Sequence, residues 1–101
     1  MRILPKPTEF SWDKGNIDKN LKKHHVTIIE AEEMFMGEPF ITADPAHSTK
    51  AEKRFQALGQ SKSNRRLFAV FTIRTNKIRV VSVRDMSKKE EQAYEKLKKD
   101  S

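Results

Sequence analysis

Arginine is concentrated in one part of this 101-residue chain. Residues 53–84 contain basic side chains but no Asp or Glu, so this segment carries +9 and the rest carries −2 of the +7 total. Its basic residues are Lys53, Arg54, Lys62, Arg65, Arg66, Arg74, Lys77, Arg79 and Arg84. One guanidinium can bind two phosphate oxygens, so this bias indicates phosphate recognition. The alternative is that these side chains only cover the solvent-exposed face of a sheet, and composition alone does not decide.

Such a set of residues suits the cleavage of RNA without a metal ion. The 2′-hydroxyl attacks the adjacent phosphate, so the substrate supplies the nucleophile and arginines can stabilise the dianionic phosphorane. Arginine is a poor proton acceptor because its pKa exceeds about 12, so the base must be another residue. The candidates are His24, Lys23 or a nearby carboxylate, and the ordinary pKa of histidine favours His24. Alternatively, His24 only caps the last carbonyls of a helix.

The sequence lacks the signatures of other catalytic centres. It has no cysteine, no phosphate-binding glycine loop and no Gly-x-Ser-x-Gly motif. His24, His25 and His47 lack the spacing of metal ligands, so we expect neither a metal nor another cofactor. The longest apolar run, Leu67 to Phe71, is far shorter than the roughly 20 residues that cross a bilayer. The amino terminus shows no signal peptide, and a cytoplasmic protein is expected.

The periodicity of the apolar residues predicts three helices. Residues 13–25 are polar and predict a solvated helix with a narrow buried edge. Thr27-Ile-Ile-Glu30 has the spacing of a capping box and begins a second helix, which Gly37 ends. Ser87-Lys-Lys-Glu90 repeats this spacing and begins a third helix.

Strand signals occupy much of the remaining chain. Strands are expected at Thr8–Trp12, Phe40–Ala43, Lys53–Leu58, Leu67–Ile73 and Lys77–Arg84. The fourth of these is apolar almost throughout, as in a central strand covered on both faces. The order of elements predicts an α+β fold, a small antiparallel sheet with helices packed mainly on one face. Residues 8–101 are expected to form a single domain after a flexible tail at residues 1–7.

The alternation of side chains along a strand limits which arginines can act together. In a regular strand Arg79 and Arg84 face opposite sides, so they share a site only if a bulge or the strand end re-aims one of them. Arg54 and Arg79 form the more conservative pair. Four other basic residues are interpreted as contacts to RNA or to a protein partner, and these are Arg65, Arg66, Arg74 and Lys77.

Four blocks of residues follow one another along the chain. They are Phe10-Ser-Trp12-Asp13; Asn20-Leu-Lys-Lys23-His24 with Val26-Thr27 and Glu30-Ala31; Glu52-Lys-Arg54-Phe55 with Leu58-Gly59; and Arg79-Val-Val-Ser82-Val-Arg84 with Glu90 and Tyr94. In this order they resemble the BrnT family of toxins from bacterial type II toxin–antitoxin pairs. The sequence departs from the family pattern at His25, where a glycine usually follows and often serves a left-handed helix end.

The resemblance implies a RelE-like fold and a ribonuclease that inhibits translation. It also implies neutralisation by a BrnA-type antitoxin with a ribbon-helix-helix DNA-binding part. The complex would repress its own operon, so operator DNA is bound only through the antitoxin complex. Carried over to this chain, the active-site positions are Arg54, Arg79 and Arg84, with Lys23 and His24 as neighbours. A basic module that binds RNA or DNA without catalysis is the alternative, because the sequence shows no obvious base.

Overall fold

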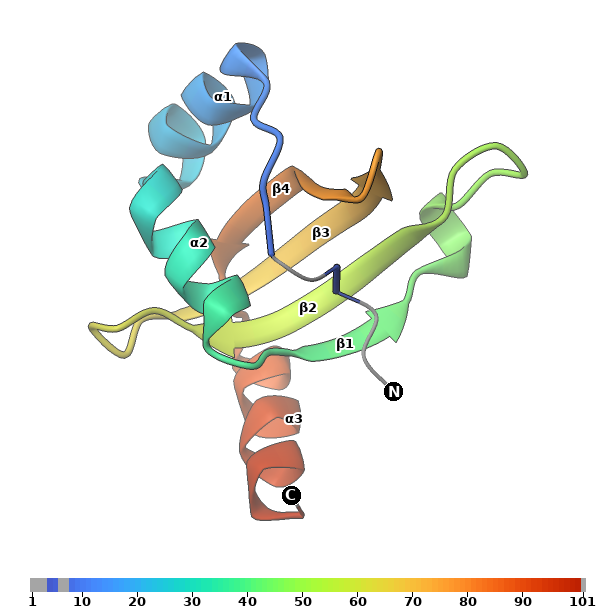
Figure 1. The fold of residues 1–101 in the computed structure, drawn as a ribbon. Coiled ribbons are helices and arrows are strands. Elements are labelled where there is room, and N and C mark those ends of the chain that lie inside the picture. Colours follow the sequence, from blue (N-terminus) through green and yellow to red (C-terminus); the bar gives the residue numbers. More distant parts are fainter. Residues whose placement is uncertain (1–3, 6–7, 101) are drawn as a thin grey trace.

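A computed structural model describes residues 4–5 and 8–100 of the chain. Four antiparallel strands form one sheet in the order β1-β2-β3-β4, with α1 and α2 on one face (Figure 1). The elements are α1 (Lys14–His24), α2 (Ile28–Met36), β1 (Phe40–Ala43), a short 3-10 helix η1 (Pro45–His47), β2 (Arg54–Gln60), β3 (Arg66–Arg74), β4 (Lys77–Asp85) and α3 (Lys88–Lys99). The predicted α+β fold is confirmed. Most of the tail predicted at residues 1–7 lies outside the described residues.

The strand predicted at Thr8–Trp12 is wrong. Within it, the structure has a single parallel bridge from Phe10 to Ile78 of β4, with two flanking backbone hydrogen bonds of 2.8 Å. Further along the same edge of β4, the side-chain oxygen of Asn20 in α1 accepts a hydrogen bond from Val83 N–H. The extended segment therefore gives way to a helix before a second bridge forms. Together the segment and α1 shield an edge that could otherwise pair with another chain.

The hydrophobic core lies between α2 and one face of the sheet. Buried side chains from both layers form it, and these are Ala57, Leu67, Ala69, Phe71, Ile78, Val80 and Val83 of the sheet with Ala31, Met34 and Phe35 of α2 and Val26 before it. The rings of Phe35 and Phe71 meet edge to face, with centroids 5.1 Å apart. At Gly59 a Cβ atom would stand only 2.8 Å from Met34 Cγ. A glycine therefore lets β2 lie directly beneath α2 without moving Met34.

The opposite face of the sheet is covered by α3, and only at one end. The ring of Tyr94 in α3 packs edge to face on Phe40, with centroids 5.7 Å apart, and lies 5.4 Å from the Arg66 guanidinium. Phe68 and Val70, which point to this face from β3, are only half-buried. The prediction that this strand is covered on both faces therefore holds for only part of its length. The remainder of the face is available to charged side chains.

The ends of the helices follow the sequence signals closely. Both predicted capping boxes are confirmed, Thr27 with Glu30 at α2 and Ser87 with Glu90 at α3. His25 follows α1 directly and has φ 55°, in the left-handed region. A glycine adopts this conformation without steric cost, whereas a histidine is strained in it. Within the described residues, no helix is both long and apolar enough to cross a membrane.

Replacing His25 by glycine should stabilise the fold. We expect His25→Gly to raise the free energy of unfolding by about 1 kcal/mol, because relief of the left-handed strain exceeds the entropy cost of a glycine. Urea denaturation monitored by circular dichroism measures this change. The control is Lys22→Gly, inside α1, which should lower the free energy of unfolding by about 1 kcal/mol. A His25→Gly protein no more stable than wild type would contradict the strain argument.

Candidate active site

A β-bulge in β4 decides which arginines share a face of the sheet. The pairing of β3 with β4 shifts by one residue between Val70 and Phe71, which leaves Val81 outside the regular ladder. Without the extra residue, Arg79 and Arg84 would point to opposite faces. The bulge reverses their relative parity, so both point to the face that α3 partly covers. Arg79 and Arg84 can therefore act on the same side of the sheet, because β4 contains the bulge that the alternation of side chains required.

Arg54 and Arg79 stand in one row across three strands. Arg54 pairs with Thr72 and Thr72 pairs with Arg79, so the two arginines flank a buried threonine. The spacing of strands puts their Cα atoms about 10 Å apart, close enough for both side chains to reach one phosphate group. Thr72 Oγ1 donates to Lys53 O at 2.8 Å, and Arg54 N–H donates to Ser48 Oγ at 2.9 Å. These bonds hold the backbone of the row in place.

Glu52 belongs to this site, although the sequence does not single it out. One of its oxygens accepts a hydrogen bond from Arg74 Nε at 2.8 Å, and the other lies 3.6 Å from Arg54 Nε. The hydrogen bond from Arg74 lowers the pKa of Glu52, and the charges of Arg54 and Arg79 lower it further. An ionised carboxylate therefore lies among three guanidinium groups. The signal in the sequence is its place two residues before Arg54, in the third motif block.

The arginine row is flanked by further charge and by an apolar hollow. Asp13 accepts a hydrogen bond from Arg79 Nη2 at 3.3 Å. Lys77 lies opposite Arg74, beside the turn between β3 and β4. A hollow of about 580 Å³ adjoins Arg54 and is lined mainly by apolar groups of β1, β2 and their connection. The row therefore has an apolar hollow beside Arg54 and a carboxylate beside Arg79.

Arg84 shares the face of the row but lies near the other end of β4. Because of the bulge, the partners of Arg79 and Arg84 on β3 are four residue steps apart, which is roughly 13 Å. The Arg84 guanidinium lies 4.4 Å from the ring centre of Phe68 and forms a bidentate ion pair with Glu90, at 2.8 and 3.0 Å. Arg66 likewise pairs with a carboxylate of α3. The structure thus pairs Arg84 and Arg66 with carboxylates of α3, whereas Arg54 and Arg79 pair with carboxylates outside this helix.

Lys23 and His24 are not brought to the arginine row. They end α1, which packs against β4 from the core side. Burial, together with the charges of Lys23 and Arg84, lowers the pKa of His24. His24 therefore lies near Arg84, at the end of β4 away from Arg54 and Arg79.

Arg65, which is among the residues predicted to contact RNA or a protein partner, is instead hydrogen-bonded within the protein. Its Nε and Nη2 donate to the two carboxylate oxygens of Asp85, at 2.7 and 3.0 Å. Its Nη groups also donate to the carbonyls of His25 and His24, at 2.8 and 3.0 Å, and to Glu30 at 3.2 Å. These acceptors match the five N–H groups of a guanidinium, and the pKa of Arg65 is raised by Asp85 and Glu30. Arg65 therefore fastens the end of α1 and the start of α2 to the end of β4.

The sheet, its helices and the arginine row define a small α+β domain with a surface suited to phosphate. The model of the family described as ribonuclease toxin, BrnT, of type II toxin–antitoxin system matches residues 12–90. The chain therefore belongs to the BrnT family, as its four motif blocks predict. Such a toxin has an antitoxin as its partner.

A solved structure supports the same fold. The crystal structure of the Brucella abortus ribonuclease toxin BrnT matches this chain with a TM-score of 0.55 and 21% sequence identity. The match covers 80% of this chain and 99% of the Brucella chain. Among curated protein sequences, none matches this chain.

The contacts of Arg65 predict a dependence of stability on pH. The pKa of Asp85 is lowered by the Arg65 hydrogen bonds, and that of Glu30 by the Thr27 N–H and by Arg65. Their contribution is therefore present above the unfolded-state pKa of about 4, and it is lost as pH falls through the lower folded-state values. We expect Arg65→Met to lower the free energy of unfolding at pH 7 by about 2–3 kcal/mol and to reduce the acid-dependent part.

The matched control is the same substitution at the neighbouring arginine, Arg66. Arg66→Met removes one ion pair at the sheet surface and should cost less than about 1 kcal/mol at pH 7, with the acid dependence of wild type. Urea denaturation at pH 7 and at several values down to pH 3 provides the comparison. Equal losses in the two variants would contradict the structural role of Arg65.

Proposed function

We propose that this chain is an endoribonuclease that cleaves RNA without a metal ion, and that its catalytic centre is the Arg54–Thr72–Arg79 row with Glu52. The observation that carries the proposal is the row itself, in which two arginines flank a fixed backbone and a carboxylate lies beside them. Cleavage of cellular RNA in the cytoplasm by such a centre would inhibit translation.

The chemistry follows from the groups that are present. Glu52 accepts the proton of the 2′-hydroxyl, whose oxygen attacks the adjacent phosphorus. Arg54 and Arg79 donate hydrogen bonds to the equatorial oxygens as negative charge grows on the phosphorane. The bond to the 5′-oxygen then breaks, and this oxygen takes a proton from solvent. The products are a 2′,3′-cyclic phosphate and a free 5′-hydroxyl, and two guanidinium groups balance charge that a metal ion would otherwise neutralise.

The remaining basic residues of this face contribute binding in the proposal. Arg66, Arg74, Lys77 and Arg84 contact phosphates on either side of the cleaved bond, since such contacts position RNA without reading its sequence. The partner is proposed to be a BrnA-type antitoxin with a ribbon-helix-helix part. Together the two proteins would bind operator DNA through the antitoxin and repress their operon.

Removing the Arg79 guanidinium should abolish cleavage while leaving the fold intact. We expect Arg79→Ala to lower kcat for RNA at least about a hundredfold, in EDTA as well as without it. The thermal midpoint should stay nearly unchanged, because the contact of Arg79 with Asp13 is exposed. Gel analysis of RNA incubated with purified, antitoxin-free protein measures cleavage.

A second arginine on the same face, Arg66, provides a control for the loss of one positive charge. Arg66→Ala should raise KM but keep kcat within about threefold of wild type, because Arg66 lies under α3 and away from the row. An Arg79→Ala protein as active as wild type would rule out the proposed role of Arg79. RNA that stays intact with wild type, while binding weakens linearly in log salt, would instead support a module that binds without catalysis.

The pH dependence of cleavage identifies the base. Because the surrounding arginines lower the pKa of Glu52, its carboxylate is ionised throughout the neutral range, so kcat should be flat from about pH 5.5 to 7.5. Glu52→Gln should lower kcat by about a hundredfold or more. His24→Gln should keep both the rate and the flat profile. A rate that instead rises between about pH 5 and 6.5, and loses this rise in His24→Gln, would assign the base to His24.

A further inference from the structure

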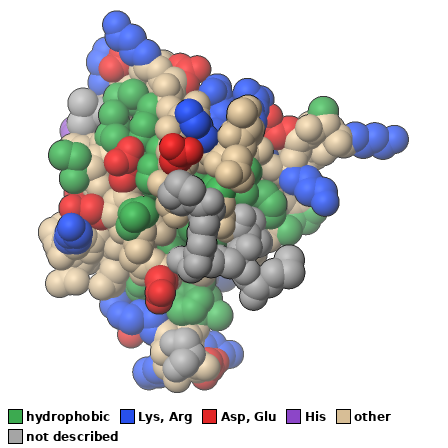
Figure 2. Space-filling view, viewed as in Figure 1, with side chains coloured by type: hydrophobic (Ala, Val, Ile, Leu, Met, Phe, Trp, Pro, Cys, Tyr) green, Lys and Arg blue, Asp and Glu red, His purple; other side chains and the backbone are tan. Residues whose placement is uncertain are grey.

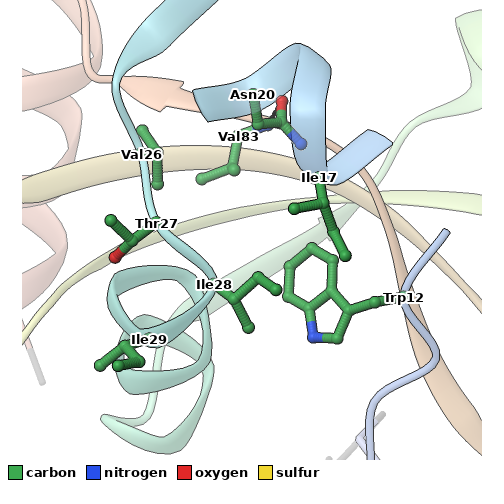
Figure 3. A pocket seen from close by; sticks show the side chains of 8 residues that line it. All are labelled: Trp12, Ile17, Asn20, Val26, Thr27, Ile28, Ile29 and Val83. Carbon is green, nitrogen blue, oxygen red and sulfur yellow. Dashed lines mark hydrogen bonds between the residues drawn. The ribbon is translucent and has the colours of Figure 1, made fainter. Parts of the chain in front are cut away.

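An apolar hollow lies on the side of the molecule away from the arginine row. It has a volume of about 410 Å³ and lies between α1, α2 and the segment that precedes α1. Figure 3 shows the side chains of Ile17, Ile28 and Trp12 converging on it, with Val26 and Val83 behind them. Val83 belongs to the core-facing side of β4, so the hollow and the row lie on opposite faces of the sheet.

The hollow contains one buried polar group without a partner. Asn20 is only 2% exposed, and its Oδ1 accepts a hydrogen bond from Val83 N–H at 3.2 Å, which fixes the orientation of the amide. Its Nδ2 is buried and lacks an acceptor among the described residues. In Figure 3 this nitrogen points to the side of Ile17. A buried amide donor without an acceptor costs free energy. An occupant that supplies a carbonyl oxygen to this donor would therefore bind more tightly.

The rim of the hollow is apolar and acidic on the side of α2, whereas α1 on the other side carries four lysines. Ile29 is 69% exposed at the edge of the hollow, and Glu32 accepts a hydrogen bond from Trp12 Nε1 at 2.8 Å. Residues 26–49 carry five acidic side chains and no Lys or Arg. Figure 2 shows apolar and acidic side chains interspersed over α2, whereas basic side chains lie over α1. The α2 side of the hollow is therefore complementary to a segment that combines apolar and basic side chains.

We propose that the hollow is the docking site for a segment of the antitoxin. The segment places an apolar side chain between Trp12 and Ile29, its backbone carbonyl accepts from Asn20 Nδ2, and a flanking Lys or Arg faces Glu32. The assignment rests on the antitoxin partnership of the proposed function. An antitoxin anchored here leaves the arginine row to another part of its chain, because the two surfaces lie on opposite faces of the sheet.

Two exposed residues of α2 provide a matched pair of variants. Ile29 lines the hollow, whereas Met36, which is 64% exposed on the same helix, does not. The probe is the antitoxin purified from the reading frame next to this chain, titrated by calorimetry. Ile29→Asp should weaken binding at least tenfold, as loss of a central apolar contact does. Met36→Asp should change the affinity by less than about threefold. Circular dichroism checks that both variants fold, and aspartate in the first turn of α2 favours the helix.

Trp12 provides a second readout, because it is the one tryptophan of the chain. Binding of a tryptophan-free antitoxin should shift Trp12 emission to shorter wavelength in wild type and Met36→Asp. Equal affinity of Ile29→Asp and wild type, or an unchanged Trp12 spectrum in the complex, would overturn the docking site. The same would follow if sedimentation showed that a second copy of this chain occupies the hollow.

RNA cleavage separates failure of the docking site from failure of the proposed function. Antitoxin-free Ile29→Asp should cleave RNA like wild type, because the hollow is not part of the arginine row. Normal cleavage together with unimpaired antitoxin binding by Ile29→Asp would overturn the docking site alone. Absence of any complex with wild type would overturn both the docking site and the partnership.

Discussion

The arrangement of the helices on the sheet depends on the guanidinium of Arg65. α1 and α2 contain only 11 and 9 residues, so neither would be stable as an isolated helix. α1 also ends at His24, so the carbonyls of His24 and of His25, which follows it, have no intrahelical partners. Arg65 binds two of these carbonyls, the Glu30 carboxylate at the start of α2 and Asp85 at the end of β4. One side chain thereby fixes the entry of α2, which supplies the helical half of the core.

The β-bulge at Val81 has the corresponding role for the other face of the sheet. The core requires Val80 and Val83 on its own side, although a regular strand would place residues three apart on opposite sides. The bulge satisfies the core, and the same change of parity turns Arg79 and Arg84 to the opposite face. The same bulge therefore places the two valines in the core and the two arginines together on the other face. The apolar hollow and the arginine row consequently lie on opposite faces of the sheet.

Much of the fold could be predicted from local signals, and the site only in part. Capping boxes and strand alternation depend on neighbouring residues, so three helices and four strands follow from the sequence. The segment at residues 8–12 alternates like a strand, but whether it pairs depends on the distant edge of β4. The sequence shows only that Arg79 and Arg84 can share a face if β4 contains a bulge or ends between them. No residue pattern near Val81 indicates that the bulge is present. The structural role of Arg65 and the approach of Glu52 to Arg74 arise from contacts between residues twenty or more positions apart in the sequence.

The carboxylates beside the arginines explain how a concentrated basic face is compatible with a stable fold. Arg54 has Glu52, Arg79 has Asp13 and Arg84 has Glu90 within ion-pair distance. Each pair holds a long side chain in one orientation, so part of the entropy cost of ordering it is met before a phosphate arrives. A phosphate that replaces a carboxylate exchanges one anion for another at the same donors. The net gain in binding free energy is therefore smaller than for unpaired arginines. A phosphorane carries more negative charge than the phosphate that precedes it, so it is bound more strongly by the same arginines. In the proposed mechanism it is this additional charge, and not the displacement of the carboxylates, that favours the transition state over the bound substrate, which is the condition for catalysis.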